Sequence, residues 1–107
     1  MSLRQQKVGK LLKEISANFL QKESSGQSLI TITDCKVSPD LKKATLFISV
    51  FPEKSEEFAL NFVKRKRRDL RDHIKHNTSM KVLPFIDIEI DMGEKNRQKI
   101  DELLKTR

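Results

Sequence analysis

Three carboxylates occupy alternate positions in the segment "FIDIEIDMG". Asp87, Glu89 and Asp91 would share one side of an extended strand. Oxygen ligands at this spacing could hold a hard divalent cation and support metal-assisted hydrolysis. The isoleucines between them favour a simpler interpretation, a strand with one buried face and one solvent-facing side. We therefore expect no metal here, and a hydrolase using these carboxylates is kept only as a third alternative.

The other groups that could act in catalysis are isolated. His73 and His76 lie three residues apart on a basic segment, with no second pair of ligands nearby. Cys35 is the single cysteine and falls in a β-branched stretch, so we expect it to pack rather than react. The glycines are scattered, so no glycine-rich phosphate loop is present. The sequence therefore predicts a protein that is not an enzyme and that carries no cofactor.

The segment "KRKRRDLRDHIKH" begins at Lys64 with five consecutive cations. Val63 before it and Leu70 within it belong to one helical apolar stripe. On an unbroken helix, Lys66 and Arg67 would lie on the buried side, where an unpaired charge costs several kcal/mol. A break in the helix within this cation run removes the conflict and turns the cations outward.

The charge balance favours a polyanionic partner. Lys and Arg number 22 against 15 acids, which gives a formal net charge of +7. Such cations bind phosphates, arginine in bidentate fashion, and each contact releases condensed counterions. Base stacking is poorly supported: Trp and Tyr are absent, and we expect Phe47 and Phe51 to pack against a helix. The pattern predicts phosphate contacts rather than readout of base sequence.

Six elements must position these residues. Apolar spacing of three and four predicts helices, and period-two or β-branched runs predict strands. The expected elements are a helix over 8–20, strands over 29–37 and 44–51, a helix from Ser55 to Ile74 with Phe58 on its apolar stripe, a strand over 81–93 and a helix over 94–105. Three strands with helices on one face make a two-layer α+β sandwich.

The length suits one domain spanning residues 1–107. No run approaches the ~18 apolar residues of a membrane-spanning helix. The N-terminal segment carries scattered charges and no continuous apolar core, unlike a secretory signal. We therefore expect a cytoplasmic location.

Four segments carry a family resemblance. They are "RQQKVGKLLKEIS", "LITITDCKVSPDLKKATLFISVF", "MKVLPFIDIEID" and "RQKIDELL". Together they resemble the ribosome-binding factor A family, bacterial factors for maturation of the small ribosomal subunit, over nearly the whole chain. The second segment, with its I-T-D-x-x-V-S-x-D-L turn, is the most distinctive.

The resemblance implies a type II KH-like fold without a GXXG loop, in the order α-β-β-α(kinked)-β-α. Relatives kink the helix before the third strand with an Ala-x-Gly element, and Lys66–Arg68 occupy that place here. It also implies a non-catalytic monomer that binds the immature small subunit and its ribosomal RNA, assisting RNA processing and late maturation. The alternative is a basic interaction module that docks an acidic protein partner.

Charge clustering selects the candidate RNA contacts, and the family motif supports Arg71 and Lys81 among them. The candidates are Arg4, Lys7, Lys64, Arg65, Lys66, Arg67, Arg68, Arg71, Lys75 and Lys81. Asp40 and Asp91 are interpreted as structural, through hydrogen bonds at a turn and at a strand end.

Overall fold

The computed structural model describes residues 2–23, 29–93, 96 and 100. Its elements are α1 (Leu3–Glu23), β1 (Leu29–Val37), β2 (Lys43–Phe51), the 3-10 turn η1 (Glu53–Ser55), α2 (Glu56–Arg65), α3 (Arg67–Asn77) and β3 (Phe85–Ile90). Their order agrees with the prediction. The closing helix expected over 94–105 lies outside the described residues, apart from positions 96 and 100. None of the described helices is long and apolar enough to cross a membrane.

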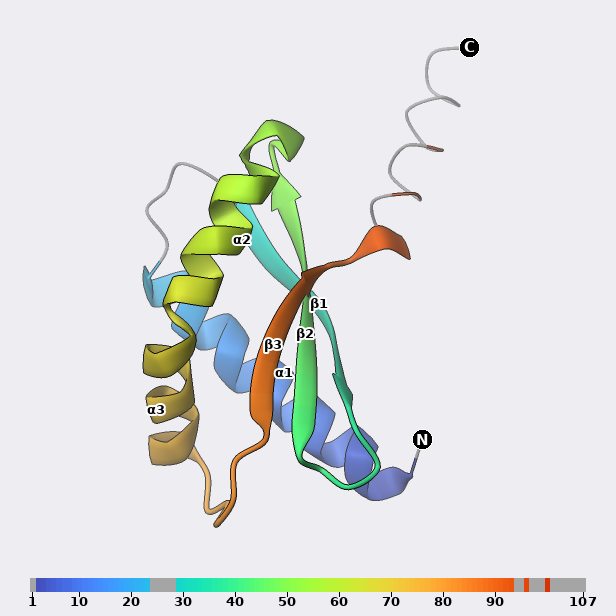
Figure 1. The fold of residues 1–107 in the computed structure, drawn as a ribbon, viewed down its shortest axis with the longest axis vertical. Coiled ribbons are helices and arrows are strands. Elements are labelled where there is room, and N and C mark those ends of the chain that lie inside the picture. Colours follow the sequence, from blue (N-terminus) through green and yellow to red (C-terminus); the bar gives the residue numbers. More distant parts are fainter. Residues whose placement is uncertain (1, 24–28, 94–95, 97–99, 101–107) are drawn as a thin grey trace.

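The sheet is mixed, with β2 at its centre. β1 pairs antiparallel to β2, and β3 pairs parallel to β2 on the other side. A parallel pair needs a long crossover between its strands, and α2 with α3 provides it. Figure 1 shows α1 crossing behind the sheet, with α2 and α3 following one another along the β3 side. The two-layer α+β prediction is confirmed.

The core lies between this helical layer and one face of the sheet. Side chains with no exposure come from both layers, including Leu12, Leu46 and Leu70. In β3, Ile86 and Ile88 are buried. Asp87 and Glu89 alternate with them on the opposite, open face, as the period of two predicts.

A β-bulge in β1 was not predicted from the sequence. The pairing of β1 with β2 shifts register between Ile32 and Asp34, which leaves Thr33 as the extra residue. The bulge changes the parity of the strand, so that Ile32 and Cys35 are both buried although they lie three residues apart. Simple alternation would have placed one of them on the open face.

Two hydrogen-bonded carboxylates stabilise the ends of strands, which confirms their structural interpretation. Asp40 Oδ1 accepts hydrogen bonds from the Ser38 hydroxyl at 2.6 Å and from the Lys42 N–H at 3.0 Å. These bonds, that from Ser38 first, lower the pKa of Asp40 below its ordinary value. Asp91 accepts a hydrogen bond from the Thr33 hydroxyl across the open face. It thereby ties the end of β3 to the bulge.

Candidate nucleic-acid interface

The long basic helix is broken at a single residue. Lys66 separates α2 from α3 and has φ −86° and ψ 3°. Its N–H donates to the Phe62 and Val63 carbonyls at 3.2 and 3.1 Å, and its carbonyl accepts from the Leu70 N–H at 2.8 Å. These angles lie in the bridge region, which residues with a side chain adopt at type I turns, so the joint forms without the small residues and glycine of the family pattern. The predicted kink within the cation run is confirmed.

The joint resolves the conflict between charge and burial. Val63 before it and Leu70 after it are both fully buried, while Lys66 and Arg67 are each about one-third exposed. The apolar stripe therefore continues across the joint. The stripe predicted before the joint, made of Phe58, Ala59, Phe62 and Val63, was wrong at one residue: Phe58 is 62% exposed, whereas Ala59 is buried as expected.

Lys66 is directed to partners within the protein. Its Nζ lies 3.4 Å from the Glu23 carboxylate and 4.0 Å from that of Asp69. The same ammonium group lies 5.9 Å from the centre of the Phe62 ring. These contacts turn it toward the end of α1, and it lines neither of the two basic hollows described below.

Arg67 joins α3 to β3. Its guanidinium lies 3.6 Å from Asp87 and 5.2 Å from the centre of the Phe85 ring. Its Nε is buried, without a hydrogen-bond partner among the described atoms. Arg67 is therefore a half-buried cation already engaged by an aromatic face and a carboxylate, unlike the exposed arginines that follow it.

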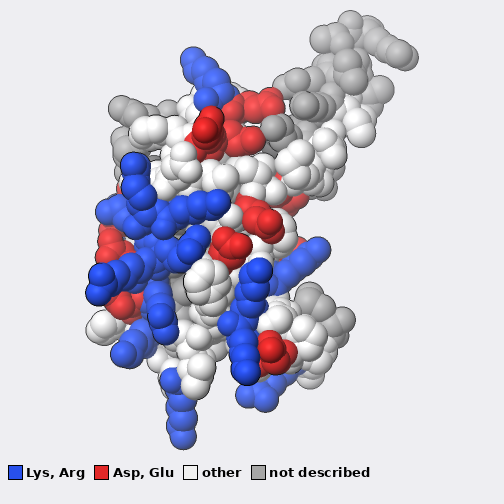
Figure 2. Space-filling view, in the orientation of Figure 1, with Lys and Arg blue, Asp and Glu red and all other residues white. Residues whose placement is uncertain are grey.

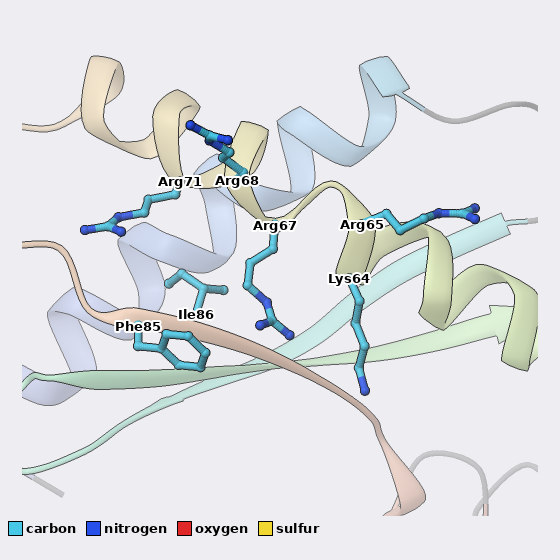
Figure 3. A pocket seen from close by; sticks show the side chains of 7 residues that line it. All are labelled: Lys64, Arg65, Arg67, Arg68, Arg71, Phe85 and Ile86. Atoms are coloured by element: carbon cyan, nitrogen blue, oxygen red, sulfur yellow. The ribbon is translucent and has the colours of Figure 1, made fainter.

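Two adjacent hollows gather most of the remaining candidate RNA contacts. The first, which we call the joint hollow, has a volume of about 430 Å³ and is lined by Lys64, Arg65, Arg67, Arg68, Arg71, Phe85 and Ile86. Figure 3 shows Arg67 reaching toward Phe85, whereas Arg65 extends away. Arg68 and Arg71 lie on the α3 side of the hollow.

The second hollow, the loop hollow, lies between α3 and the segment leading to β3. Its volume is about 350 Å³, and it is lined by Arg68, Arg71, Asp72, Lys75, Met80, Lys81, Val82 and Leu83. Arg68 and Arg71 belong to both hollows, so the two form one basic surface. Lysine and arginine side chains gather over the α2 and α3 side in Figure 2.

This surface can bind several phosphates at once. Arg68, Arg71 and Lys75 are exposed on α3, so little desolvation opposes their use. Asp72 is the carboxylate among the lining residues of the two hollows. A dense array of one sign raises the local potential and attracts polyanions.

Besides Lys66, two further candidates lie outside the hollows. Arg4 and Lys7 are exposed on the first turns of α1 and line neither hollow. The Gln5 side chain between them donates to the Val37 carbonyl at 2.7 Å, which places this end of α1 beside the turn between β1 and β2. The structure therefore brings together seven of the ten candidates: Lys64, Arg65, Arg67, Arg68, Arg71, Lys75 and Lys81.

An aromatic residue in the basic surface was missed from sequence. Phe85 is 57% exposed and lines the joint hollow. The interpretation of Phe47 and Phe51 as helix-packed residues was wrong. Phe47 lies half-buried on the open face with the Lys36 ammonium 5.5 Å from its ring, and Phe51 is 72% exposed. The alternation with Ile86 could have indicated that Phe85 faces away from the core.

The two histidines that were first considered for catalysis make contacts within the fold. The His73 ring packs against Phe19 with centroids 5.5 Å apart, and His76 Nδ1 lies 2.7 Å from the Asp72 carbonyl oxygen. In the described part of the chain, no three His, Cys, Asp or Glu side chains converge as a metal site requires.

Cys35 is expected to resist thiol reagents. Burial first, and the charge of Asp34 second, raise the pKa of its thiol from 9.0 to about 11. Near pH 8 the folded protein should react about 100-fold more slowly than the unfolded chain, because each pKa unit lowers the thiolate fraction about tenfold. Labelling with and without guanidinium measures this ratio of rates; equal rates would contradict the prediction.

The raised pKa of Cys35 also makes folding stability depend on pH. As pH rises from 9 to about 11, the unfolded chain loses the thiol proton before the folded protein does, so folding stability should fall.

The fold and the basic surface together define a class of protein. The chain is a small α+β domain of the KH-like type, with a broken helix that presents a cationic surface beside an edge strand. The family model for ribosome-binding factor A matches residues 4–104. The chain belongs to the ribosome-binding factor A family.

Individual relatives agree with this assignment. A ribosome-binding factor A from Macrococcus caseolyticus is 31% identical over 110 residues, covering 96% of this chain and 96% of the relative. One from Bradyrhizobium sp. (strain BTAi1) is 29% identical, covering 98% and 80%. The resemblance inferred from the sequence motifs is confirmed.

Solved structures share the fold. The crystal structure of a ribosome-binding factor A from Thermus thermophilus has a TM-score of 0.72 at 23% identity, covering 80% of this chain and 94% of that one. A homology model of the Thermus thermophilus ribosome-binding factor A, fitted into a cryo-electron microscopy map of its 30S complex, has a TM-score of 0.67 at 24% identity, covering 76% and 88%. At these identities the likeness concerns the fold.

Proposed function

We propose that this protein binds the small ribosomal subunit by gripping phosphates of its ribosomal RNA. The observation that carries the proposal is the convergence of seven cations on the joint hollow and the loop hollow. Family membership supports the choice of partner, since a homology model of a relative has been fitted into the map of a 30S complex. Phosphate binding suits this surface because its arginines offer paired N–H donors and its lysines add compact charges.

The proposed role is non-catalytic. The protein acts as a monomeric, cytoplasmic, single-domain factor on the immature subunit and assists ribosomal RNA processing and late maturation. Arg68, Arg71 and Lys75 on α3, with Lys81 in the segment after it, would follow one stretch of the RNA backbone, and Lys64 and Arg65 would extend the contact onto α2. Arg4 and Lys7 are proposed as a separate contact, reached by a different part of the RNA.

Co-sedimentation with immature and mature small subunits at two salt concentrations tests this function. We expect binding that favours the immature subunit. Raising salt from about 50 to 200 mM should weaken it by roughly 1000-fold if about six phosphates are contacted. Salt-insensitive binding, or equal binding to both subunits, would contradict the proposal. Tight binding to RNA-free ribosomal protein would instead favour the alternative, an acidic protein partner.

A further inference from the structure

The joint hollow contains an exposed aromatic ring on a hydrogen-bonded stretch of backbone. Phe85 begins β3 directly after the buried Pro84, and its N–H donates to the Lys42 carbonyl at 2.8 Å. The parallel pairing of β3 with β2 starts at this same residue, opposite Lys43. The backbone beneath the ring is therefore fixed, although 57% of the residue remains exposed.

A planar cation lies against this ring. The Arg67 guanidinium is 5.2 Å from the ring centre and is restrained by Asp87 at 3.6 Å. Figure 3 shows the Arg67 side chain descending from the joint toward the Phe85 side of the hollow. Both groups present flat surfaces of the kind on which nucleobases stack.

Cations around the joint hollow provide the positive charge that a phosphate group requires. Lys64, Arg68 and Arg71 line the hollow and are exposed. The cavity of about 430 Å³ falls in the size range of small-ligand sites, and the buried Ile86 adds apolar surface. An aromatic surface with cations around it matches one nucleotide, which has a flat base that can stack and an anionic phosphate.

We propose that the joint hollow takes one unpaired nucleotide of the RNA, with its base against Phe85 and Arg67 and its phosphate on Arg71 or Lys64. This inference rests on the proposed function and narrows its substrate to RNA with an accessible single-stranded position. A continuous duplex cannot enter in this way, because its bases are stacked on one another and only its edges and backbone are presented. Phosphate gripping alone would accept both forms.

Substitution of Phe85 by leucine separates stacking from charge. The variant Phe85→Leu keeps an apolar side chain and every cation but removes the π-face. We expect affinity for a single-stranded oligoadenylate to fall about tenfold, within the range for loss of one base–aromatic stack. Affinity for a blunt-ended duplex of two separate strands, with the same number of phosphates, should not change. Fluorescence anisotropy at constant salt measures both.

Two further variants complete the test. Phe58→Leu removes an aromatic ring of similar exposure, 62%, that lines neither hollow, and it should leave both affinities unchanged. Phe85→Tyr keeps an aromatic ring, so its affinity for single strands should match that of the wild-type protein and exceed that of Phe85→Leu. Equal losses on both RNAs, or no loss with Phe85→Leu, would overturn the stacking proposal.

Failure of stacking can be distinguished from failure of RNA binding. If the wild-type protein binds both RNAs in a salt-dependent way and Phe85→Leu has no effect, the proposed function stands and the nucleotide site falls. If the wild-type protein binds neither RNA and instead binds an acidic protein, both proposals fall together.

Discussion

Replacing Arg68 and Arg71 with glutamate is expected to weaken binding to small-subunit RNA on the order of 100-fold. These two arginines line both hollows, so their reversal affects the whole basic surface. Each lost phosphate contact removes the gain from counterion release, and each new carboxylate repels a phosphate. The slope of log affinity against log salt should also become shallower by about 2, at about 0.9 per phosphate contact.

A matched variant separates this local effect from net charge. Lys10 and Lys54 are exposed, lie on α1 and η1, and line neither hollow. Reversing them to glutamate changes the net charge by the same −4, from +7 to +3. The control should lose little affinity. Equal weakening of the two double variants would mean that the RNA responds to overall charge and not to the joint.

Arg67 is left out of this test for a structural reason. It is half-buried between Phe85 and Asp87, so a glutamate there would place two carboxylates close together. Loss of binding in such a variant would combine altered folding with lost contacts. Arg68 and Arg71 are exposed, so their reversal should leave the circular dichroism spectrum and the melting temperature nearly unchanged.

The second large effect is expected in the core beneath the joint. Leu70 has no exposed surface, and its N–H donates to the Lys66 carbonyl at 2.8 Å. Leu70→Ala should lower the free energy of unfolding by about 3 kcal/mol, because it removes buried methyl groups and leaves a cavity. In a domain of this size that corresponds to a fall in Tm of roughly 12–24 °C, measurable by calorimetry.

The corresponding control is an exposed leucine in a helix. Leu3 is 67% exposed at the start of α1, so Leu3→Ala should change the free energy of unfolding by less than about 0.5 kcal/mol. If Leu70→Ala were equally mild, the core would not continue across the joint. The explanation for the outward turn of the cations would then be wrong.

Local sequence patterns determined most of the secondary structure. Alternation over 44–51 and the β-branched run over 29–37 predicted β2 and β1 to within one residue at each end. The break in the helix was also predictable. Val63 and Leu70 require burial on one stripe, and the intervening Lys66 and Arg67 cannot follow them into the core. These inferences depend only on neighbours within about two helical turns.

The family was likewise accessible from the sequence, because the turn motif around Asp40 is both local and distinctive. The hydrogen bonds of Asp40 to Ser38 and Lys42 join residues only two positions away. Such bonds impose a direct requirement on nearby residue types.

Tertiary structure alone decided which cations lie together. Ten basic residues were equivalent candidates by charge, yet the hollows gather seven of them and leave Arg4 and Lys7 at the other end of α1. Lys66 is withdrawn by Glu23, a partner more than 40 positions earlier in the chain. Charge patterns in a sequence carry no information on which distant carboxylate will neutralise a given cation.

Tertiary structure likewise decided which aromatic residue belongs to the basic surface. Phe85 lies at the joint hollow because β3 pairs parallel to β2 and brings its first residue beside α3. The bulge at Thr33, which sets the faces of β1, also depends on pairing with a separate strand. Sequence periodicity describes each element alone, whereas convergence depends on how the elements pack. The sequence therefore determined the elements, the joint and the family, and the fold decided the composition of the surface.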